Sequence, residues 1–316
     1  MDLCLYTDSV ASLSLDEALD FAVSIGASAV EIAAGGQSSA PHMRVFELLE
    51  DPRRRAEFVD KLSERGLRLA AVNCSAWPMH PREGERHVEI IRAAIRLAGA
   101  LGVDKIVTMS GCPGESAQAR AIHWITFPWP EDRYAILGEQ WDRAFAVWHD
   151  LAEYAVQHGV TRIALELHPL QLVYNVPTLQ RMRTEIGPVI GANVDPSHMF
   201  WQQMDPVRVV HALGPAIFHV HLKDTEMRAD SLALNGVLDA TPFADIDRRS
   251  WIFRTVGQGH PASFWRSFLG ALAEAGYEDV LSIENEDPLQ PAQVGAKQAA
   301  DFITGLNAES VSRGKR

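Results

Sequence analysis

Eight short runs of apolar residues alternate along the chain with longer stretches in which apolar residues recur at helical spacing. The runs lie at residues 3–6, 29–32, 68–73, 105–109, 162–167, 190–195, 217–222 and 280–284. They are almost continuously apolar, which is typical of parallel strands that are covered on both faces of a sheet. The pattern therefore predicts repeated strand–helix units.

Helix signals lie between these runs. Ser14 and Glu17 form a capping-box pattern ahead of apolar residues at helical spacing, which predicts a helix start. A second amphipathic stretch covers about 86–101, with Gly102 as its predicted end, and a third begins near Pro291. Eight strand–helix repeats predict an α/β fold, a (β/α)₈ TIM barrel. An open doubly wound sheet is the alternative, but no glycine-rich dinucleotide turn follows the first strand.

Two connections are longer than the rest, at about 110–134 and 223–260. Each follows a strand, so both are expected on the face where barrel enzymes form their active sites. Trp124 and Trp129 lie in the first connection, and this aromatic content argues against disorder. No low-complexity linker divides the sequence, so residues 1–316 are predicted to form one domain.

Composition narrows the functional classes. The 316 residues carry a formal net charge of −12, which disfavours a non-specific nucleic-acid binder. Three cysteines, an odd number, imply no disulfide framework and are consistent with a reducing compartment. The N-terminal MDLCLYTDSV lacks the basic and apolar regions of a signal peptide, and no stretch is long enough to span a membrane. A cytoplasmic protein is expected, with no membrane or nucleic-acid partner.

Four of the apolar runs end in a residue type that binds metal ions: Glu166, Asp195, His221 and Glu284. An ionisable side chain at the end of a buried strand is costly unless it is paired or bound to a metal. The carboxyl ends of barrel strands converge on the axis, so the four would share one site. Three carboxylates and an imidazole suit Mn²⁺, Mg²⁺ or Co²⁺, with Zn²⁺ as an alternative. The alternative, that these are four unrelated polar strand ends, is disfavoured because all four residues share the same place at the end of a strand.

Other polar residues near these runs have both a functional and a structural interpretation. His168 stands before a proline, which keeps it out of a helix and close to the predicted site. Lys223 could hold a substrate oxygen or pair with a carboxylate, and the same holds for Arg254. His219 alternates with His221 and is expected to face the other way, in a structural or supporting role.

Aromatic and weaker candidates come from the long connections and their surroundings. Trp124, Trp129 and Trp201 could form an apolar platform for a sugar face or an aromatic aglycone, or could simply pack under a loop. Asn175 is a weaker polar candidate for substrate binding. Cys112 is not favoured as a nucleophile, because nothing in the sequence supplies its base.

The strings around the four metal-type residues carry a family resemblance: LELHP, NVDPSH, HVHLKD and LSIENED. In them the chain resembles the sugar phosphate isomerase/epimerase family of xylose-isomerase-like barrels, over nearly its whole length. The resemblance implies one divalent metal ion, with manganese favoured, held by Glu166, Asp195, His221 and Glu284. It also implies that His198, in DPSH, contacts the substrate, which would be a small sugar or glycoside.

Within that family, five strings are most similar to the catalytic subunits of C-glycoside deglycosidases and related 3-oxo-glycoside lyases: SGCPG, HWITFPWPED, ELHPLQLVYN, DPSHMFWQ and FRTVGQGH. This similarity implies elimination of the aglycone from a glycoside already oxidised at C3, with His168 as the base that removes the C2 proton. Epimerases of the family instead use two metal-bound carboxylates, here Glu166 and Glu284, on opposite faces of the sugar. An isomerase or 3-epimerase is therefore the second expectation, and an inosose-type dehydratase is the third.

Two further classes are disfavoured. AP endonucleases share the fold and cleave phosphodiesters, but the net charge of −12 and the small set of metal ligands argue against that activity. The complete four-residue ligand set argues against a non-catalytic sugar-binding subunit. The deglycosidase relatives work with a small second subunit and barrels of this family often form homo-oligomers, so either form of assembly is compatible with the resemblance.

Overall fold

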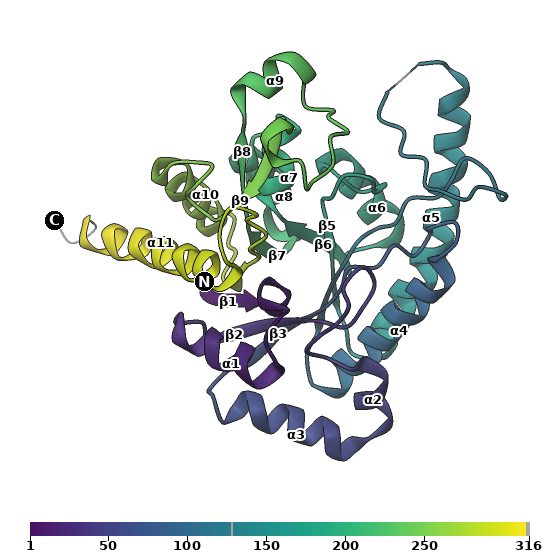
Figure 1. Cartoon of the computed structure of the whole chain (residues 1–316). Coiled ribbons are helices and arrows are strands. Elements are labelled where there is room, and N and C mark those ends of the chain that lie inside the picture. The colour runs from purple at the N-terminus through teal and green to yellow at the C-terminus, as the bar shows by residue number, and fades with distance from the viewer. Residues whose placement is uncertain (128, 314–316) are drawn as a thin grey trace.

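The computed structural model describes residues 1–127 and 129–313, with side chains through Leu306. Eight parallel strands close into a barrel in the order β1-β10-β7-β6-β5-β4-β3-β2 (Figure 1). The barrel strands are β1 (Asp2–Tyr6), β2 (Ala29–Ala33), β3 (Arg68–Cys74), β4 (Lys105–Thr108), β5 (Arg162–Glu166), β6 (Ile190–Val194), β7 (Ile217–Leu222) and β10 (Val280–Ile283). All eight predicted strands are present, and the predicted (β/α)₈ barrel is confirmed.

Helices surround the barrel (Figure 1). They are α1 (Leu15–Ser24), α2 (Val45–Glu50), α3 (Pro52–Ser63), α4 (Gly84–Ala100), α5 (Asp132–Gln157), α6 (Val176–Ile186), α7 (Pro196–Trp201), α8 (Pro206–Leu213), α9 (Ala229–Asn235), α10 (Ala262–Glu274) and α11 (Ala292–Arg313). The predicted capping box forms, because Ser14 and Glu17 each accept a hydrogen bond from the other's backbone amide. Within the described ranges, no helix is both long enough and apolar enough to cross a membrane.

Successive side chains of a barrel strand point alternately outward and inward, so the apolar core has one layer outside the barrel and another inside it. Outward-facing residues such as Leu165, Val220 and Ile283 join one large apolar cluster with the helices. Ala71, Val107 and Ala164 form a separate small cluster. Each is adjacent in sequence to an outward-facing residue, so its own side chain points into the barrel. Small side chains at this level leave the carboxyl ends of the strands free to carry polar groups.

The amino ends of the strands form the base of the barrel, where a group of ion pairs lies. Lys105, the first residue of β4, is fully buried, and its Nζ lies 2.8 Å from Asp279 Oδ2. Arg162 Nη1 lies 3.1 Å from the same oxygen, and Arg68 Nη2 lies 3.0 Å from Asp279 Oδ1. One carboxylate is therefore shared by three cations from β3, β4 and β5.

The first long connection has neither helix nor strand in its described residues until α5 begins at Asp132. Side chains of α5 hold it through hydrogen bonds to its backbone. Trp148 Nε1 donates to the Ser110 carbonyl at 2.9 Å, and Gln140 Nε2 donates to the His123 carbonyl at 2.8 Å. These bonds agree with the expectation that this segment is ordered.

The second long connection contains structure of its own. Strands β8 (Asp224–Met227) and β9 (Trp251–Arg254) pair as an antiparallel hairpin that stands out beside α7 and α10, and the connection between the two strands contains α9 (Figure 1). The Asp224 carboxylate fixes the start of the hairpin to the turn that follows it. It accepts hydrogen bonds from the amides of Gly257, Gly259 and His260, each at 3.0 Å. His260 thus has a structural role here.

Candidate active site

The four predicted metal-type residues come together at the carboxyl ends of the strands. Glu166 is the last residue of β5 and His221 lies on β7, whereas Asp195 and Glu284 directly follow β6 and β10. Both of these strands end one residue earlier than predicted. One ligand atom from each of the four side chains lies within 4.8 Å of all the others. That they bind a metal ion stays a prediction.

The chemistry of this cluster fits a cation. Asp195 Oδ1 accepts a hydrogen bond from the Ser197 amide at 2.8 Å, while Oδ2 is buried without a hydrogen-bond partner among the described residues. Burial, reinforced by two nearby carboxylates, raises the pKa of Asp195 to about 8 despite Lys223. Burial also raises the pKa of Glu166. Crowded carboxylates with an unused oxygen are an arrangement that a divalent ion would stabilise.

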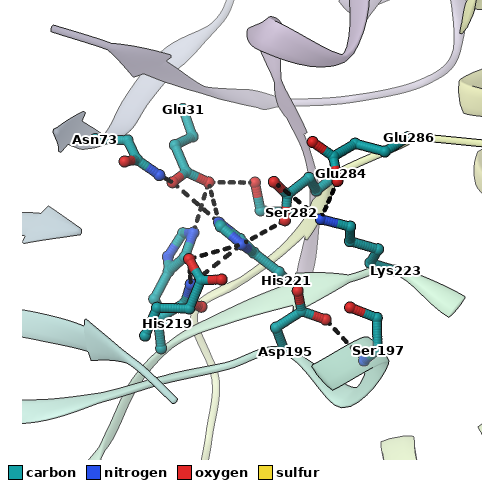
Figure 2. A network of polar contacts seen from close by, with 12 residues as sticks. Glu31, Asn73, Asp195, Ser197, His219, His221, Lys223, Ser282, Glu284 and Glu286 are labelled. Carbon is teal, nitrogen blue, oxygen red and sulfur yellow. Dashed lines mark hydrogen bonds and ion pairs between the residues drawn. The ribbon is translucent and has the colours of Figure 1, made fainter. Parts of the chain in front are cut away.

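His221 is held from below by Glu31, a residue of β2 that the sequence analysis did not select. His221 Nε2 lies 3.1 Å from both Glu31 carboxylate oxygens, while Nδ1 lies 2.9 Å from Glu284 Oε2 (Figure 2). Glu31 is fully buried and also accepts hydrogen bonds from Asn73 at 2.7 Å and Ser282 at 2.6 Å. A carboxylate behind the distal nitrogen is typical of metal-binding histidines, because it orients the ring and fixes its tautomer.

His219 corrects one sequence expectation. It was expected to face away from His221, but both rings contact Glu31, and His219 Nε2 lies 2.8 Å from Glu31 Oε2 (Figure 2). The expectation was wrong because residues two apart on a strand share a face. Burial lowers the pKa of His219 to about 4, so the ring is neutral and supports Glu31.

A cavity of about 270 Å³ opens over the cluster. Residues from the second half of the barrel line it: Glu166, His168, His198, Lys223 and Glu284. Polar residues from the ends of β1–β3 and the loops after them also line the cavity: Asp8, Ser9, Gln37, Ser38, Asn73 and Ser75. Sequence reasoning missed this second group, although its members also follow strand ends. Such hydroxyl, amide and carboxylate groups can hydrogen-bond to a polyhydroxylated ligand.

His168 lines this cavity, and its Nε2 has no hydrogen-bond partner among the described residues. Its Nδ1 lies 2.5 Å from the Pro169 carbonyl, which accepts the Nδ1 proton and leaves the lone pair on Nε2. Burial, together with His198, lowers the pKa of His168 to about 4, so the neutral, basic form is present at neutral pH. The His168 and His198 ring centroids are 4.1 Å apart, and His198 Nε2 lies 3.3 Å from Glu166 Oε1.

Lys223 lies at the edge of the same cavity and is almost fully buried. Its Nζ lies 3.4 Å from Glu284 Oε1 and 2.5 Å from Glu286 Oε2 (Figure 2). Burial alone would lower the pKa of Lys223, but Glu284 and Glu286 together raise it above its usual value. The side chain is therefore charged and paired, and it also faces the cavity.

The sequence matches the family model described as xylose isomerase-like TIM barrel over residues 19–306. The chain belongs to this family. A relative in Bacillus subtilis (strain 168), the uncharacterized protein YfiH, is 38% identical over 307 residues, which cover 96% of this chain and 98% of YfiH.

Solved structures show the same xylose isomerase-like fold. The probable 3-DHS dehydratase AsbF of Bacillus anthracis, involved in petrobactin synthesis, has a TM-score of 0.69 at 19% identity, covering 96% of this chain and 99% of that one. L-Ribulose 3-epimerase has a TM-score of 0.65 at 18% identity, covering 99% and 96%. The IolI protein, solved with a bound zinc atom, has a TM-score of 0.65 at 21% identity, covering 99% of both chains. At these identities the likeness concerns the fold.

Arg254 and Asn175 are engaged with protein groups and do not line the cavity of this family member. Arg254 Nε lies 3.1 Å from Asp287 Oδ2, and its Nη1 pairs with Glu226 across the hairpin. Asn175 caps the start of α6, where its side chain accepts a hydrogen bond from the Thr178 amide at 3.1 Å. Substrate contacts by these two residues stay predictions.

The tryptophans predicted as an apolar platform are dispersed. Trp124 packs edge-on against Tyr174 with ring centroids 5.2 Å apart, and Trp129 is 70% exposed. Trp201 is buried and stacks on Trp251 at 4.8 Å. None of the three predicted tryptophans lines the cavity. Their contact with a ligand also stays a prediction.

Proposed function

We propose that this protein is a divalent-metal-dependent sugar enzyme that removes a proton next to a carbonyl group. The observation that carries this proposal is His168, which lines a cavity together with Glu166 and Glu284 of the four-residue metal-type cluster, and whose Nδ1 faces the Pro169 carbonyl and so leaves the lone pair on Nε2. Other polar residues that line the cavity, such as Asp8 and Ser38, are suited to sugar hydroxyls.

Glu166, Asp195, His221 and Glu284 would hold the ion. Three carboxylates and one imidazole favour manganese, with magnesium, cobalt or zinc as alternatives. The zinc atom in the IolI structure supports a divalent ion in a related barrel. When bound, such an ion acts as a Lewis acid that makes a proton beside the carbonyl more acidic.

For the reaction itself we favour elimination of the aglycone from a 3-oxo-glycoside. His168 Nε2 takes the proton from C2, the electron pair of that C–H bond forms a C1–C2 double bond, and the bond from C1 to the aglycone breaks with its pair. The imidazolium can return the proton to the leaving group. His198 and Lys223 line the cavity and would hold substrate oxygens during this transfer.

A sugar isomerase or 3-epimerase is the second candidate. It is favoured by the positions of Glu166 and Glu284, which both line the cavity and could exchange protons from different sides of a sugar. L-Ribulose 3-epimerase and the probable dehydratase AsbF share the fold, and a dehydratase is the third candidate. A cytoplasmic location, and a small second subunit or a homo-oligomer, remain part of the proposal.

One assay separates these reactions. The manganese-loaded protein is incubated in D₂O with a 3-oxo-glucoside and, separately, with free ketoses. Aglycone release from the 3-oxo-glucoside is expected. Deuterium incorporation into a ketose with a new epimer, and no release, would replace the lyase by an epimerase. No reaction with either compound, with metal bound, would overturn the proposal for this chain acting alone.

A further inference from the structure

A second cleft adjoins the cavity, and the side chain of Phe253 lines both spaces. The cleft has a volume of about 350 Å³ and is lined by Phe243, Ile252, Phe253, Glu286 and Pro288. Phe253 and Glu286 line both spaces, so the cleft continues the cavity outward along the β8–β9 hairpin.

The two faces of Phe253 meet different chemistry. On the cavity side, the His198 ring lies edge-on to Phe253 at 5.5 Å, and Lys223 Nζ lies 4.4 Å from the Phe253 centroid. On the cleft side, Phe243 lies nearly parallel to Phe253, with centroids 6.1 Å apart and an interplanar angle of 17°. A ligand that passes Phe253 therefore leaves a polar site and enters an apolar one.

The cleft walls select for an apolar group. Phenylalanine, isoleucine and proline side chains offer no hydrogen bonds, so a second sugar ring would lose contacts with water there. The one charged wall residue, Glu286, lies at the cavity side and is paired with Lys223 at 2.5 Å. Phe243 is 64% exposed, and Arg249 stacks on its ring at 4.1 Å from the centroid, which holds the ring in place.

We infer that this cleft is a subsite for an aromatic group attached to the sugar bound in the cavity. The inference rests on the proposed function, because it takes the sugar to lie over Glu166, His168 and Glu284. It identifies the substrate class as an aryl glycoside rather than a free sugar. The ring would lie against Phe243 and Phe253, with a geometry that aromatic pairs favour.

Binding of two unreactive probes tests this assignment without turnover. 4-Nitrophenyl glucoside and methyl glucoside lack a C3 ketone, so neither can undergo the elimination. Isothermal titration calorimetry with manganese-loaded protein should show that the aryl probe binds at least about tenfold more tightly, because its ring leaves water. No advantage of the aryl probe, including no binding of either probe, would overturn the assignment.

Substitutions of Phe243 test whether the tighter binding of the aryl probe arises in the cleft. Phe243→Ala should reduce the aryl advantage to less than about threefold and leave methyl glucoside binding unchanged, while Phe243→Leu should retain part of it. Phe46→Ala is the matched control, because Phe46 is 48% exposed and lies on α2, outside the cleft. An aryl advantage that Phe243→Ala leaves intact contradicts the assignment. A Phe243-dependent advantage in a protein that processes neither 3-oxo-glucosides nor ketoses supports the cleft and overturns the proposed function.

Discussion

The two ends of the barrel differ in how their buried charges are neutralised. At the base, one carboxylate, Asp279, is shared by Lys105, Arg162 and Arg68. At the carboxyl ends of the strands, several carboxylates crowd together, and Asp195 keeps an oxygen without a hydrogen-bond partner among the described residues. The base satisfies its charges within the protein, whereas the other end leaves charge for a ligand.

The pKa values express the same contrast. Burial alone would raise the pKa of Asp279, but Lys105, Arg68 and Arg162 together outweigh it and lower that pKa well below its usual range. Burial raises the pKa of Asp195 to about 8, because its neighbours do not compensate. The ion pairs at the amino end of the barrel should therefore contribute to stability, and the buried Asp195 at the other end should cost stability until a cation binds.

Removing a metal-type carboxylate should give the largest effect. Glu166→Gln and Glu284→Gln should each abolish activity and weaken manganese binding by at least about 10²-fold, because each removes a charged ligand. The metal-free Glu166→Gln variant should be no less stable than the wild type, since burial and Glu284 raise the Glu166 pKa and the substitution removes that unfavourable charge. Turnover and metal titration measure these effects, with the exposed Glu278→Gln as control. Full activity in either variant would remove the argument for a metal site.

Substitution at the amino end of the barrel should have the opposite effect: it should lower stability and leave activity unchanged. Asp279→Asn should lower the free energy of unfolding by about 3 kcal/mol, because it leaves the buried Lys105 without its carboxylate. Activity per folded molecule should not change. Chemical denaturation measures the loss, and Glu278→Gln is again the control, since it changes an exposed carboxyl group next in sequence. A loss below about 0.5 kcal/mol would show that these ion pairs contribute little.

His168→Ala should separate chemistry from metal binding at the carboxyl end. Turnover should fall by about 10² or more, the scale of a lost general base, while metal content and stability stay near wild type. His211→Ala, a change at a half-exposed histidine, is the control. An unchanged rate would assign the base role to Glu166 or Glu284.

The smallest expected effect is a difference in acid sensitivity between the wild type and Asp279→Asn. A lowered pKa means that Asp279 stabilises the fold above its unfolded-state pKa of about 3.9, and that this stability is lost as the pH falls through the folded-state value. Between pH 5 and pH 2, the wild type should lose about 1 kcal/mol more unfolding free energy than Asp279→Asn. Denaturation curves at several pH values test this, and parallel curves for the two proteins would contradict it.

The fold could be predicted from sequence because each barrel strand is a short, nearly pure apolar run. Four site residues could be predicted because Glu166, Asp195, His221 and Glu284 interrupt such runs at their ends. Glu31 could not, because it lies inside the run AVEIA, and its partner His221 is 190 positions away. Asp8 and Ser38 were missed because polar residues after a strand are common in any loop.

The side-chain contacts within the hairpin could not be predicted from the sequence either. Arg254 was a plausible substrate ligand, but its partners are Glu226 on the opposite strand and Asp287 after β10. Phe243 and Phe253 are ten positions apart in a segment with no regular period. Phe243 lies in the connection between β8 and β9, and only the folding of that connection onto β9 brings its ring to 6.1 Å from the ring of Phe253.

The hairpin held by Asp224 is an insertion in the barrel, and it supplies Phe243 and Phe253, whereas the metal-type residues and His168 come from the barrel itself. Under the proposed function, replacing this insertion would change which leaving group is accepted and would leave the proposed catalytic residues of the barrel in place. For an engineer, residues 228–250 are the segment to diversify when new substrates are sought.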